Sequence, residues 1–256
     1  MTPDPIPVRS PSMLECRNCG AGAPLDEHFC GQCNRILALG RHGDYFAFLG
    51  VPRRLELDPQ DLERRFRDLS RKFHPDYFYN ASPAERLASL ERSSYLNDAY
   101  RTLRNHATRI EHLLAIEGLA PAKSDEGSVK VPPALLEEVF ELNEELDQIR
   151  ASREGGGDEA SLRARLEAAR LPIDRKREEH ERRIAELSHQ WDRQVEAQAT
   201  DRKPTLEALR ELLFERKYID NLLATIEREA AGLEPSPSGS AQPGAAGAKP
   251  GGQGHS

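Results

Sequence analysis

The chain has 256 residues, of which 31% are charged and only 6% are aromatic, and its formal net charge is -7. This composition supports one or two small helical units rather than a large core. The negative balance argues against nonspecific binding to nucleic acid, so any basic recognition must be local. No apolar run approaches the length that crosses a bilayer.

The N-terminal segment, residues 1–13, contains several prolines and no apolar stretch of the kind found in signal peptides. It also lacks the arginine-rich amphipathic pattern of transit sequences. We therefore expect residues 1–13 to be disordered and the protein to be cytoplasmic.

All four cysteines lie between positions 16 and 33, in two Cys-x-x-Cys pairs. Two thiolates three residues apart can clamp one ion from a tight turn, and Gly20 and Asn34 tolerate the positive φ that such turns need. Four thiolates complete a tetrahedron, so residues 14–40 are predicted to hold one structural Zn²⁺ per chain. The predicted ligands are Cys16, Cys19, Cys30 and Cys33.

Other uses of these sulfurs stay open at this stage. A rubredoxin-like iron site has the same four ligands, and ligand type does not exclude it. Disulfides are disfavoured in a protein that is not secreted, and a redox dithiol lacks its βαβ context. His28 is interpreted as a surface loop histidine, because four cysteines already saturate zinc.

A basic amphipathic helix is predicted from about Asp58 to Phe73. Leu62, Phe66, Leu69 and Phe73 fall at the spacings that make one apolar stripe. The arginines on the outward side are Arg64, Arg67 and Arg71. Such a surface suits an acidic partner, although it would also suit nucleic-acid phosphates.

The tripeptide His74-Pro75-Asp76 follows this helix directly. Pro75 disfavours the α conformation at His74, so the helix should end near Phe73. Asp76 can hydrogen-bond nearby backbone and hold a turn. Pro83 then lies where it can begin a second helix, so the tripeptide is expected on an exposed, sharply turned loop between two helices.

These elements resemble a J-domain, the helical-hairpin co-chaperone module that stimulates ATP hydrolysis by heat-shock-70-class chaperones. Further segments, within roughly 43–233, make the resemblance closest to the HscB family of co-chaperones for iron–sulfur cluster assembly. They are Asp44-Tyr45-Phe46-Ala47-Phe48-Leu49-Gly50-Val51-Pro52, Phe66-Arg67-Asp68-Leu69, Asn97-Asp98-Ala99-Tyr100-Arg101-Thr102-Leu103 and Arg109-Ile110-Glu111-His112-Leu113-Leu114.

The resemblance implies roles for particular residues. His74, Pro75 and Asp76 would couple chaperone contact to ATP hydrolysis. The outward arginines would meet the acidic surface of the chaperone; they are Arg64, Arg67 and Arg71. Because the ATPase site would lie in the partner, no enzyme activity is expected of this chain.

We assign the J-domain to residues 43–119 and a linker, rich in glycine, serine and charged residues, to 120–131. A C-terminal helical bundle is assigned to 132–233. Its first helix is predicted over about Ala134–Ala151, with one apolar stripe suited to bundle packing. The stripe residues are Leu135, Val139, Leu142, Leu146 and Ile149.

Leu136 and Phe140 lie off this stripe, beside acidic residues. Another helix could cover them, or they could form a binding patch. In the HscB family the corresponding helix binds the iron–sulfur scaffold protein IscU, through apolar residues with neighbouring glutamates. The resemblance therefore implies a scaffold-binding set of Leu136, Phe140, Glu141, Glu144 and Tyr218. The family often has methionine where this chain has Glu137.

A second bundle helix is expected from about Asp158 to Ala199, with a kink or break near Leu171 because Pro172 interrupts the hydrogen-bond ladder. Pro204 marks the start of a third. Short loops between three helices predict an antiparallel bundle. Proline, glycine, alanine and serine dominate residues 234–256, which we expect to be a disordered tail.

The predicted fold is thus all-α, with a small N-terminal zinc ribbon or knuckle, a J-domain hairpin and an antiparallel three-helix bundle. The resemblance implies a co-chaperone that delivers an IscU-type scaffold to a heat-shock-70-class chaperone of HscA or DnaK type. Alternatives are a general protein-folding J-domain co-chaperone and a zinc-containing nucleic-acid-binding regulator. The latter is disfavoured by the net charge and by the lack of aromatic stacking positions among the basic residues. No membrane partner is expected.

Overall fold

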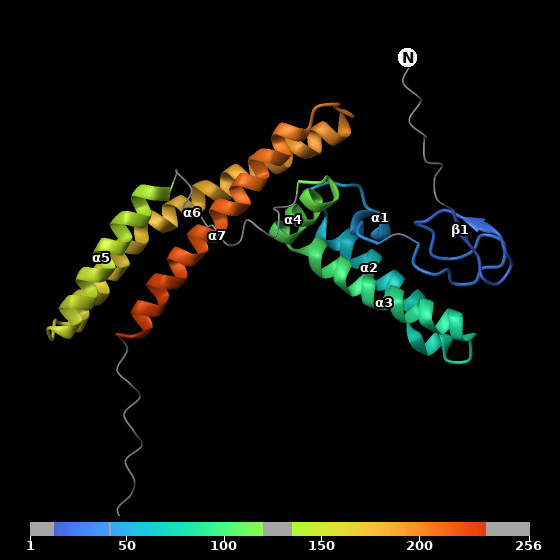
Figure 1. Ribbon diagram of the computed structural model, residues 1–256, viewed down its shortest axis with the longest axis horizontal. Coiled ribbons are helices and arrows are strands. Elements are labelled where there is room, and N and C mark those ends of the chain that lie inside the picture. The colour runs from blue at the N-terminus through green and yellow to red at the C-terminus, as the bar shows by residue number, and fades with distance from the viewer. Residues whose placement is uncertain (1–12, 41, 120–134, 234–256) are drawn as a thin grey trace, which may run out of the picture.

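The computed structural model describes residues 13–40, 42–119 and 135–233 (Figure 1). These residues are mostly helical, with one small two-stranded sheet near the N-terminus, which confirms the predicted all-α class. No helix in these ranges is both long and apolar enough to cross a membrane. The segments predicted to be disordered or to form the linker lie outside the described residues, except for Met13.

The N-terminal part is a compact turn-rich unit, residues 13–40, which we call the cysteine module. Its strands β1 (Leu14–Glu15) and β2 (Gly22–Ala23) pair antiparallel, with Leu14 opposite Ala23. A short helix, α1 (Tyr45–Leu49), follows the module. The carboxylate of Asp44 accepts a hydrogen bond from the Ala47 N–H and so caps the start of α1.

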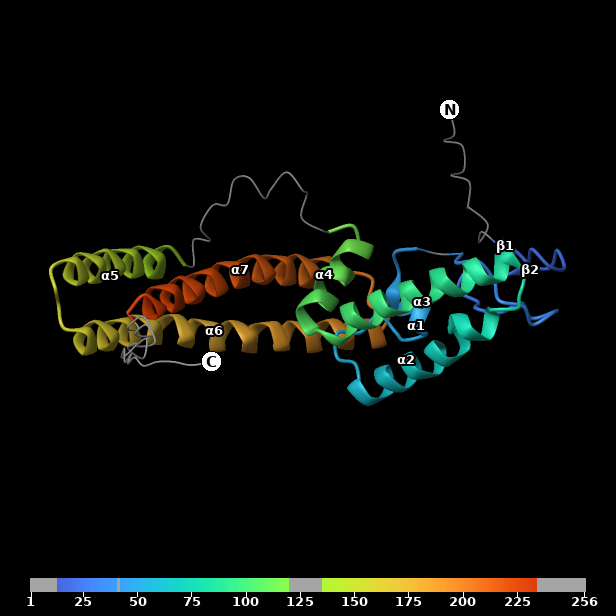
Figure 2. The same ribbon diagram turned by 90° about the horizontal axis from the view of Figure 1, so that it is seen from below.

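The middle of the chain is a helical hairpin, in which α2 (Pro59–Phe73) lies beside α3 (Pro83–Arg104) (Figure 2). A 3₁₀ helix, η1 (Pro75–Phe78), lies in the connection, and α4 (His106–Ile116) follows the hairpin. Local sequence sets the start of α3, because Ser82 and Glu85 form a reciprocal capping box. The observed end of α2 and the observed start of α3 are therefore close to those predicted from the sequence.

The C-terminal part is a bundle of three helices, α5 (Leu136–Glu154), α6 (Glu159–Glu196) and α7 (Lys203–Ala231). Both α5 and α7 pack against α6 (Figure 1). The stripe predicted for the first helix faces the bundle core: four of its residues are buried and Val139 packs beside them. The buried residues are Leu135, Leu142, Leu146 and Ile149.

Of the two outcomes predicted near Leu171, a kink or a break, the break is wrong, because α6 continues through Pro172 from Glu159 to Glu196. A proline removes one backbone hydrogen bond from a helix. Here Leu166 and Ile173, one on each side of Pro172, are both buried in the bundle core. Burial of apolar side chains on both sides of the proline favours a continuous helix over a broken one.

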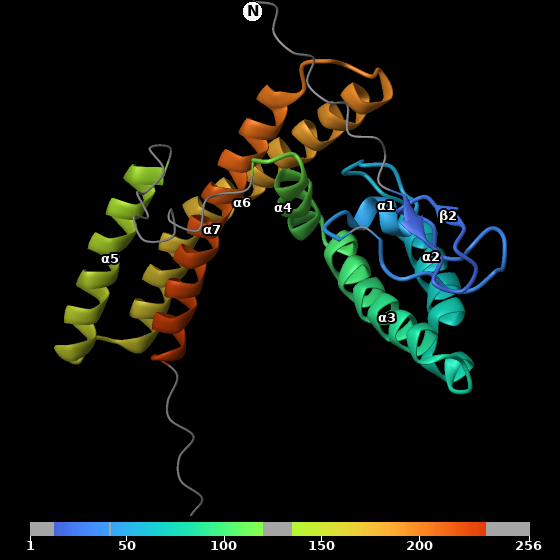
Figure 3. The same cartoon turned by 45° about the vertical axis from the view of Figure 1, so that its right-hand side comes forward.

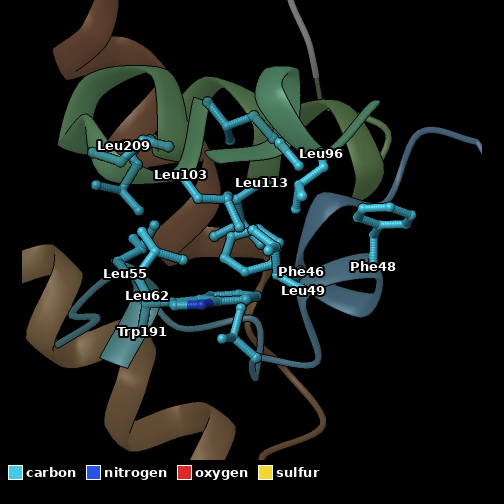
Figure 4. Packing of buried hydrophobic residues seen from close by; sticks show 14 of the residues in the cluster. Phe46, Phe48, Leu49, Leu55, Leu62, Leu96, Leu103, Leu113, Trp191 and Leu209 are labelled. Atoms are coloured by element: carbon cyan, nitrogen blue, oxygen red, sulfur yellow. The ribbon is translucent and has the colours of Figure 1, made fainter. Parts of the chain in front are cut away.

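The hairpin and the bundle share a hydrophobic core. Trp191 of α6 and Leu209 of α7 lie among side chains of the hairpin region, such as Phe46 and Leu55 (Figure 4). The distal halves of the same two helices contribute to a second core together with α5. As a result the hairpin and the outer end of the bundle extend from the shared core as two arms (Figure 3).

Polar contacts fix the junction between the two arms. The carboxylate of Asp192, which is 3% exposed, accepts hydrogen bonds from the backbone N–H groups of Leu55 (2.7 Å) and Glu56 (2.9 Å). The indole N–H of Trp191 donates to the carbonyl of Arg53 at 2.9 Å. The loop before α2 is therefore held by two consecutive residues of α6, and we call this contact the α6 junction.

Replacement of Asp192 by alanine should destabilise the protein, because one buried and one partly buried backbone N–H group lose a charged acceptor. We expect the free energy of unfolding to fall by about 3 kcal/mol in urea denaturation. The matched control is Glu196→Ala, since Asp192 and Glu196 both pair with Arg54 but Glu196 is exposed, and its loss should cost below about 0.5 kcal/mol. Equal effects of the two substitutions would contradict the importance assigned to the α6 junction.

Candidate functional site

The two cysteine pairs form two turns with the same backbone hydrogen bonds. In the first, Cys16 N–H donates to the Ala21 carbonyl and Gly20 N–H to the Cys16 carbonyl, both at 2.8 Å. In the second, Cys30 N–H donates to the Arg35 carbonyl at 2.9 Å and Asn34 N–H to the Cys30 carbonyl at 2.8 Å. Gly20 and Asn34 have positive φ (74° and 55°), as the sequence predicts.

The four sulfurs converge on one point. The Cys16 and Cys33 sulfurs are 3.6 Å apart, as are those of Cys19 and Cys30, and all four lie within 4.8 Å of one another. A tetrahedral ion with metal–sulfur bonds of about 2.3 Å requires sulfurs separated by about 3.8 Å. The donor set therefore fits one tetrahedral metal ion, with no further ligand needed.

The pKa values of the cysteine thiols also indicate that the cluster binds a cation. A hydrogen bond from the backbone of Arg35 lowers the pKa of Cys33 to about 6. The backbone of Ala21 acts in the same direction on Cys19, but burial and the three neighbouring thiols outweigh it and raise the pKa of Cys19 to about 12. Four thiolates at this separation repel one another, so a bound cation is needed to ionise all of them near neutral pH.

His28 is not a surface loop histidine, which corrects the sequence interpretation. Its Nε2 lies 3.1 Å from the carbonyl of Phe48, and its Nδ1 lies 2.7 Å from a guanidinium nitrogen of Arg92. Since a carbonyl only accepts, Nε2 carries the proton and Nδ1 accepts from Arg92. Burial, together with the charge of Arg92, lowers the pKa of His28 to about 4, so the ring is neutral. It joins the cysteine module to the hairpin.

Arg92 is a site residue that the sequence reasoning missed. It lies on the inward face of α3, four residues after Ala88 and four before Leu96, which are both buried. The sequence signal that could have identified Arg92 is a charged residue in the middle of an apolar stripe, because an inward-facing cation needs buried hydrogen-bond acceptors. Those acceptors come from the cysteine module, which no local pattern reveals.

The tripeptide His74-Pro75-Asp76 lies at the exposed tip of the hairpin. The helix α2 ends at Phe73, whose carbonyl accepts hydrogen bonds from the hydroxyls of Ser89 (2.6 Å) and Ser93 (3.0 Å). The turn is held differently from the sequence expectation. The His74 ring accepts from the N–H of Asp76 at 3.3 Å, and the Asp76 carboxylate, which is 86% exposed, lies 3.5 Å from the same ring nitrogen.

The outward arginines of α2 are exposed, as predicted, but they are not an uninterrupted positive strip. Each one pairs with an acidic residue one turn earlier on the same helix. The pairs are Arg64 with Asp61, Arg67 with Glu63, and Arg71 with Asp68. Exposed pairs of this kind contribute about 0.5 kcal/mol, so an incoming acidic surface can replace the intrahelical partners at little cost.

The α5 patch, which we define as Leu136, Phe140, Glu141 and Glu144, lies on the solvent side of α5. Leu136 is 54% exposed and Phe140 is 70% exposed, so no other described helix covers them. That excludes the interpretation that they are bundle-core residues. The N-terminal half of α5 therefore presents two large apolar side chains with carboxylates beside them.

Tyr218, the remaining residue of the predicted scaffold-binding set, lies on α7 and is half-buried against the bundle core. Its ring is 5.7 Å from that of Phe214, which is itself an exposed aromatic residue. Phe214 was missed by the sequence reasoning, although it precedes Tyr218 by four residues and so shares its helix face. Helix α5 and the hairpin tip lie at opposite ends of the molecule (Figures 1 and 2).

A helical hairpin with His-Pro-Asp at its tip, followed by a helical bundle, is the architecture of a J-domain co-chaperone. The structure is similar to the crystal structure of human co-chaperone protein HscB, with a TM-score of 0.57 and 26% sequence identity. The match covers 84% of this chain and 98% of the human chain. The fold is therefore HscB-like.

A second solved structure, chaperone HscB from Vibrio cholerae, is 28% identical. It matches over 75% of this chain and 99% of its own, with a TM-score of 0.48. No family model matches the chain.

Elemental analysis of the protein, purified under reducing conditions, should find one metal ion per chain. Cys19→Ser should weaken metal retention on the order of 100-fold or more against a competing chelator, since even outer-shell partners are worth about 10–100-fold. Gln32→Ser is the matched control, because it changes an exposed residue between two ligands and keeps the backbone N–H. A preparation that contains only disulfides, or equal retention by both variants, would contradict the metal site.

Proposed function

We propose that this protein is a noncatalytic co-chaperone that presents an IscU-type iron–sulfur scaffold to a heat-shock-70-class chaperone of HscA or DnaK type. The observation that carries the proposal is the exposed His74-Pro75-Asp76 tip in an HscB-like fold. In this proposal the ATPase site lies in the chaperone, and the co-chaperone accelerates hydrolysis there by binding. A cytoplasmic location is part of the proposal.

The chaperone would bind along α2 and its tip. Arg64, Arg67 and Arg71 would attract an acidic surface and exchange their intrahelical partners for it. That encounter would place the tripeptide against the chaperone. The exposed carboxylate of Asp76 and the adjacent His74 ring offer one acceptor and one polarisable group on a short turn. Pro75 limits the conformations of this turn, so little order has to be acquired on binding.

The scaffold would bind the α5 patch. Exposed apolar residues with a polar border are typical of a protein-binding surface, because the apolar centre provides burial and the carboxylates provide selectivity. Leu136 and Phe140 would be the apolar centre, and Glu141 and Glu144 the border. Tyr218 would extend the surface onto α7. Occupation of both arms would bring scaffold and chaperone into one complex, in which ATP hydrolysis is coupled to cluster transfer.

We also propose that the ion of the cysteine module is Zn²⁺. Four thiolates in a tetrahedron are a common structural zinc site, and zinc has no redox chemistry that would require a change of geometry. When bound, the zinc ion would crosslink the two cysteine turns of the module, whose own hydrophobic core is very small.

Simultaneous replacement of His74, Pro75 and Asp76 by alanine should reduce stimulation of the chaperone ATPase to the basal rate. Affinity for the scaffold should not change, since the tripeptide is remote from α5. The measurement is single-turnover ATP hydrolysis by the chaperone, with scaffold affinity determined in parallel. Asn80→Ala is the control, because it changes an exposed residue of the same connection. Full stimulation by the triple variant would overturn the proposed trigger.

Leu136→Ala combined with Phe140→Ala should weaken scaffold binding by about tenfold or more, which corresponds to about 1.4 kcal/mol. The free energy of unfolding should change by below about 1 kcal/mol, because both side chains are largely exposed. Leu171→Ala is the matched control, since Leu171 is an exposed leucine (57%) of the same bundle that lies outside the patch. Calorimetric titration with the scaffold measures the effect.

Unchanged scaffold affinity in the double variant would remove α5 from the binding surface. A broad set of bound polypeptides, rather than the scaffold, would instead favour a general protein-folding co-chaperone. Recovery of the scaffold together with the chaperone from the native host distinguishes these outcomes.

A further inference from the structure

Arg92 is a buried cation whose hydrogen-bond partners all belong to the cysteine module. The side chain lies on α3 and is 1% exposed. Nε donates to the carbonyl of Leu37 at 2.7 Å. The two terminal nitrogens donate to the backbone carbonyls of Ala38 (2.9 Å) and Glu27 (3.0 Å) and to Nδ1 of His28 (2.7 Å). None of these acceptors is a carboxylate, and burial lowers the pKa of Arg92 to about 10. Loss of the module would leave this charge without its acceptors.

The acceptors of Arg92 stand on both sides of the second cysteine turn. The segment from His28 to Leu37 is a small hairpin, closed by the Leu37 N–H to His28 carbonyl bond (3.0 Å) and by the bridge between Phe29 and Ile36. Cys30 and Cys33 lie at its turn. A metal ion that holds both thiolates keeps this hairpin closed, and so keeps the acceptors of Arg92 in position.

The module also contacts both ends of the connection that carries the tripeptide. At the near end, the rings of His28 and Phe29 pack on Phe73, the residue before His74, at centroid distances of 5.0 and 6.0 Å. At the far end, Arg35 pairs with Glu85 at 3.2 Å, and Glu85 is the capping-box residue of α3. The residues on either side of the tip are thus both contacted by one hairpin of the module.

We propose that the metal-bound cysteine module is a brace for the trigger loop, residues 74–82, with Arg92 as its positioning residue. Metal binding orders the hairpin, the hairpin holds Arg92 and Phe73, and the base of the trigger loop becomes rigid. The strength of chaperone stimulation then depends on metal occupancy, and this part rests on the proposed function. Scaffold binding at α5 does not depend on it.

Thermodynamic linkage makes the brace reciprocal. If metal binding orders the trigger loop through Arg92, then weakening the Arg92 contacts must weaken metal binding by the same factor. Arg92→Lys tests this, because lysine keeps the charge in place but its ammonium cannot reach all the acceptors of a guanidinium. A module that merely folds beside the hairpin would retain its metal in this variant.

The experiment compares the full chain in three forms: zinc-loaded, zinc-depleted by a chelator under reducing conditions, and zinc-loaded with Arg92→Lys. Amide hydrogen exchange is read at residues 70–85, with residues 159–173 of the distal bundle as internal control. We expect exchange at 70–85 to rise at least about fivefold in the depleted protein and in Arg92→Lys, with no change at 159–173. Arg101→Lys, an exposed arginine of the same helix, should behave as the unmodified chain.

Two further readouts complete the test. Arg92→Lys should release Zn²⁺ to a competing chelator at least about fivefold more readily than the Arg101→Lys control. Zinc depletion should reduce stimulation of the chaperone ATPase by a similar factor and leave scaffold affinity unchanged. Zinc depletion of the unmodified chain tests the brace even if Arg92→Lys fails to fold.

Unchanged exchange at residues 70–85 after zinc depletion overturns the brace, whether or not the zinc-loaded protein stimulates a chaperone. Increased exchange at 159–173 to the same extent also overturns it, because metal loss then acts through general unfolding. Exchange that rises only at 70–85, in a protein that stimulates no chaperone, supports the brace and overturns the proposed function. The two failures are therefore distinguishable.

Discussion

The arrangement of this molecule depends on the pairing of the Asp192 carboxylate with the backbone of Leu55 and Glu56. Apolar burial at the shared core is strong but has no direction, so it alone would allow α6 to slide or rotate against the hairpin. A buried carboxylate needs its two N–H donors, and only one register of α6 supplies them. The donor–acceptor match therefore selects one orientation, and the indole of Trp191, bonded to Arg53, adds a second fixed point.

This constraint extends to the ends of the molecule because α6 is one continuous helix. The part of α6 that enters the shared core also carries α5 at its other end. The separation between the hairpin tip and the α5 patch is thus set by helix length and by the α6 junction, rather than by a flexible connection. For the proposed function, a bound scaffold and a bound chaperone would meet with a defined spacing.

The sequence predicts best what depends on neighbouring residues. The turns at Gly20 and Asn34 follow from cysteine spacing and backbone conformation, and the buried stripe of α5 follows from helical periodicity. The predictions from sequence were wrong where contacts with residues distant in the sequence determine the conformation or the burial. Pro172 does not break α6, because both flanking segments are held by the bundle core. His28 is not a surface residue, because the fold brings to it the Phe48 carbonyl and Arg92, which lie 20 and 64 positions further along the chain.

Two buried arginines show how polar contacts arrange this small fold. Arg109 of α4 donates to the carbonyl of Leu103 at 2.6 Å and also to that of Leu55, in the loop that the α6 junction holds. Arg92 does the same for the carbonyls of the cysteine module. A guanidinium that is paired with carbonyls, rather than with a carboxylate, gains less attraction than it would from an ion pair, so its value lies in geometry. Each arginine holds irregular segments in place by hydrogen bonds to their backbone carbonyls, and these segments have little apolar surface of their own. The hairpin is therefore anchored near the middle of α3 by Arg92 and near its base by Arg109, and α2 remains exposed along its arginine-bearing face.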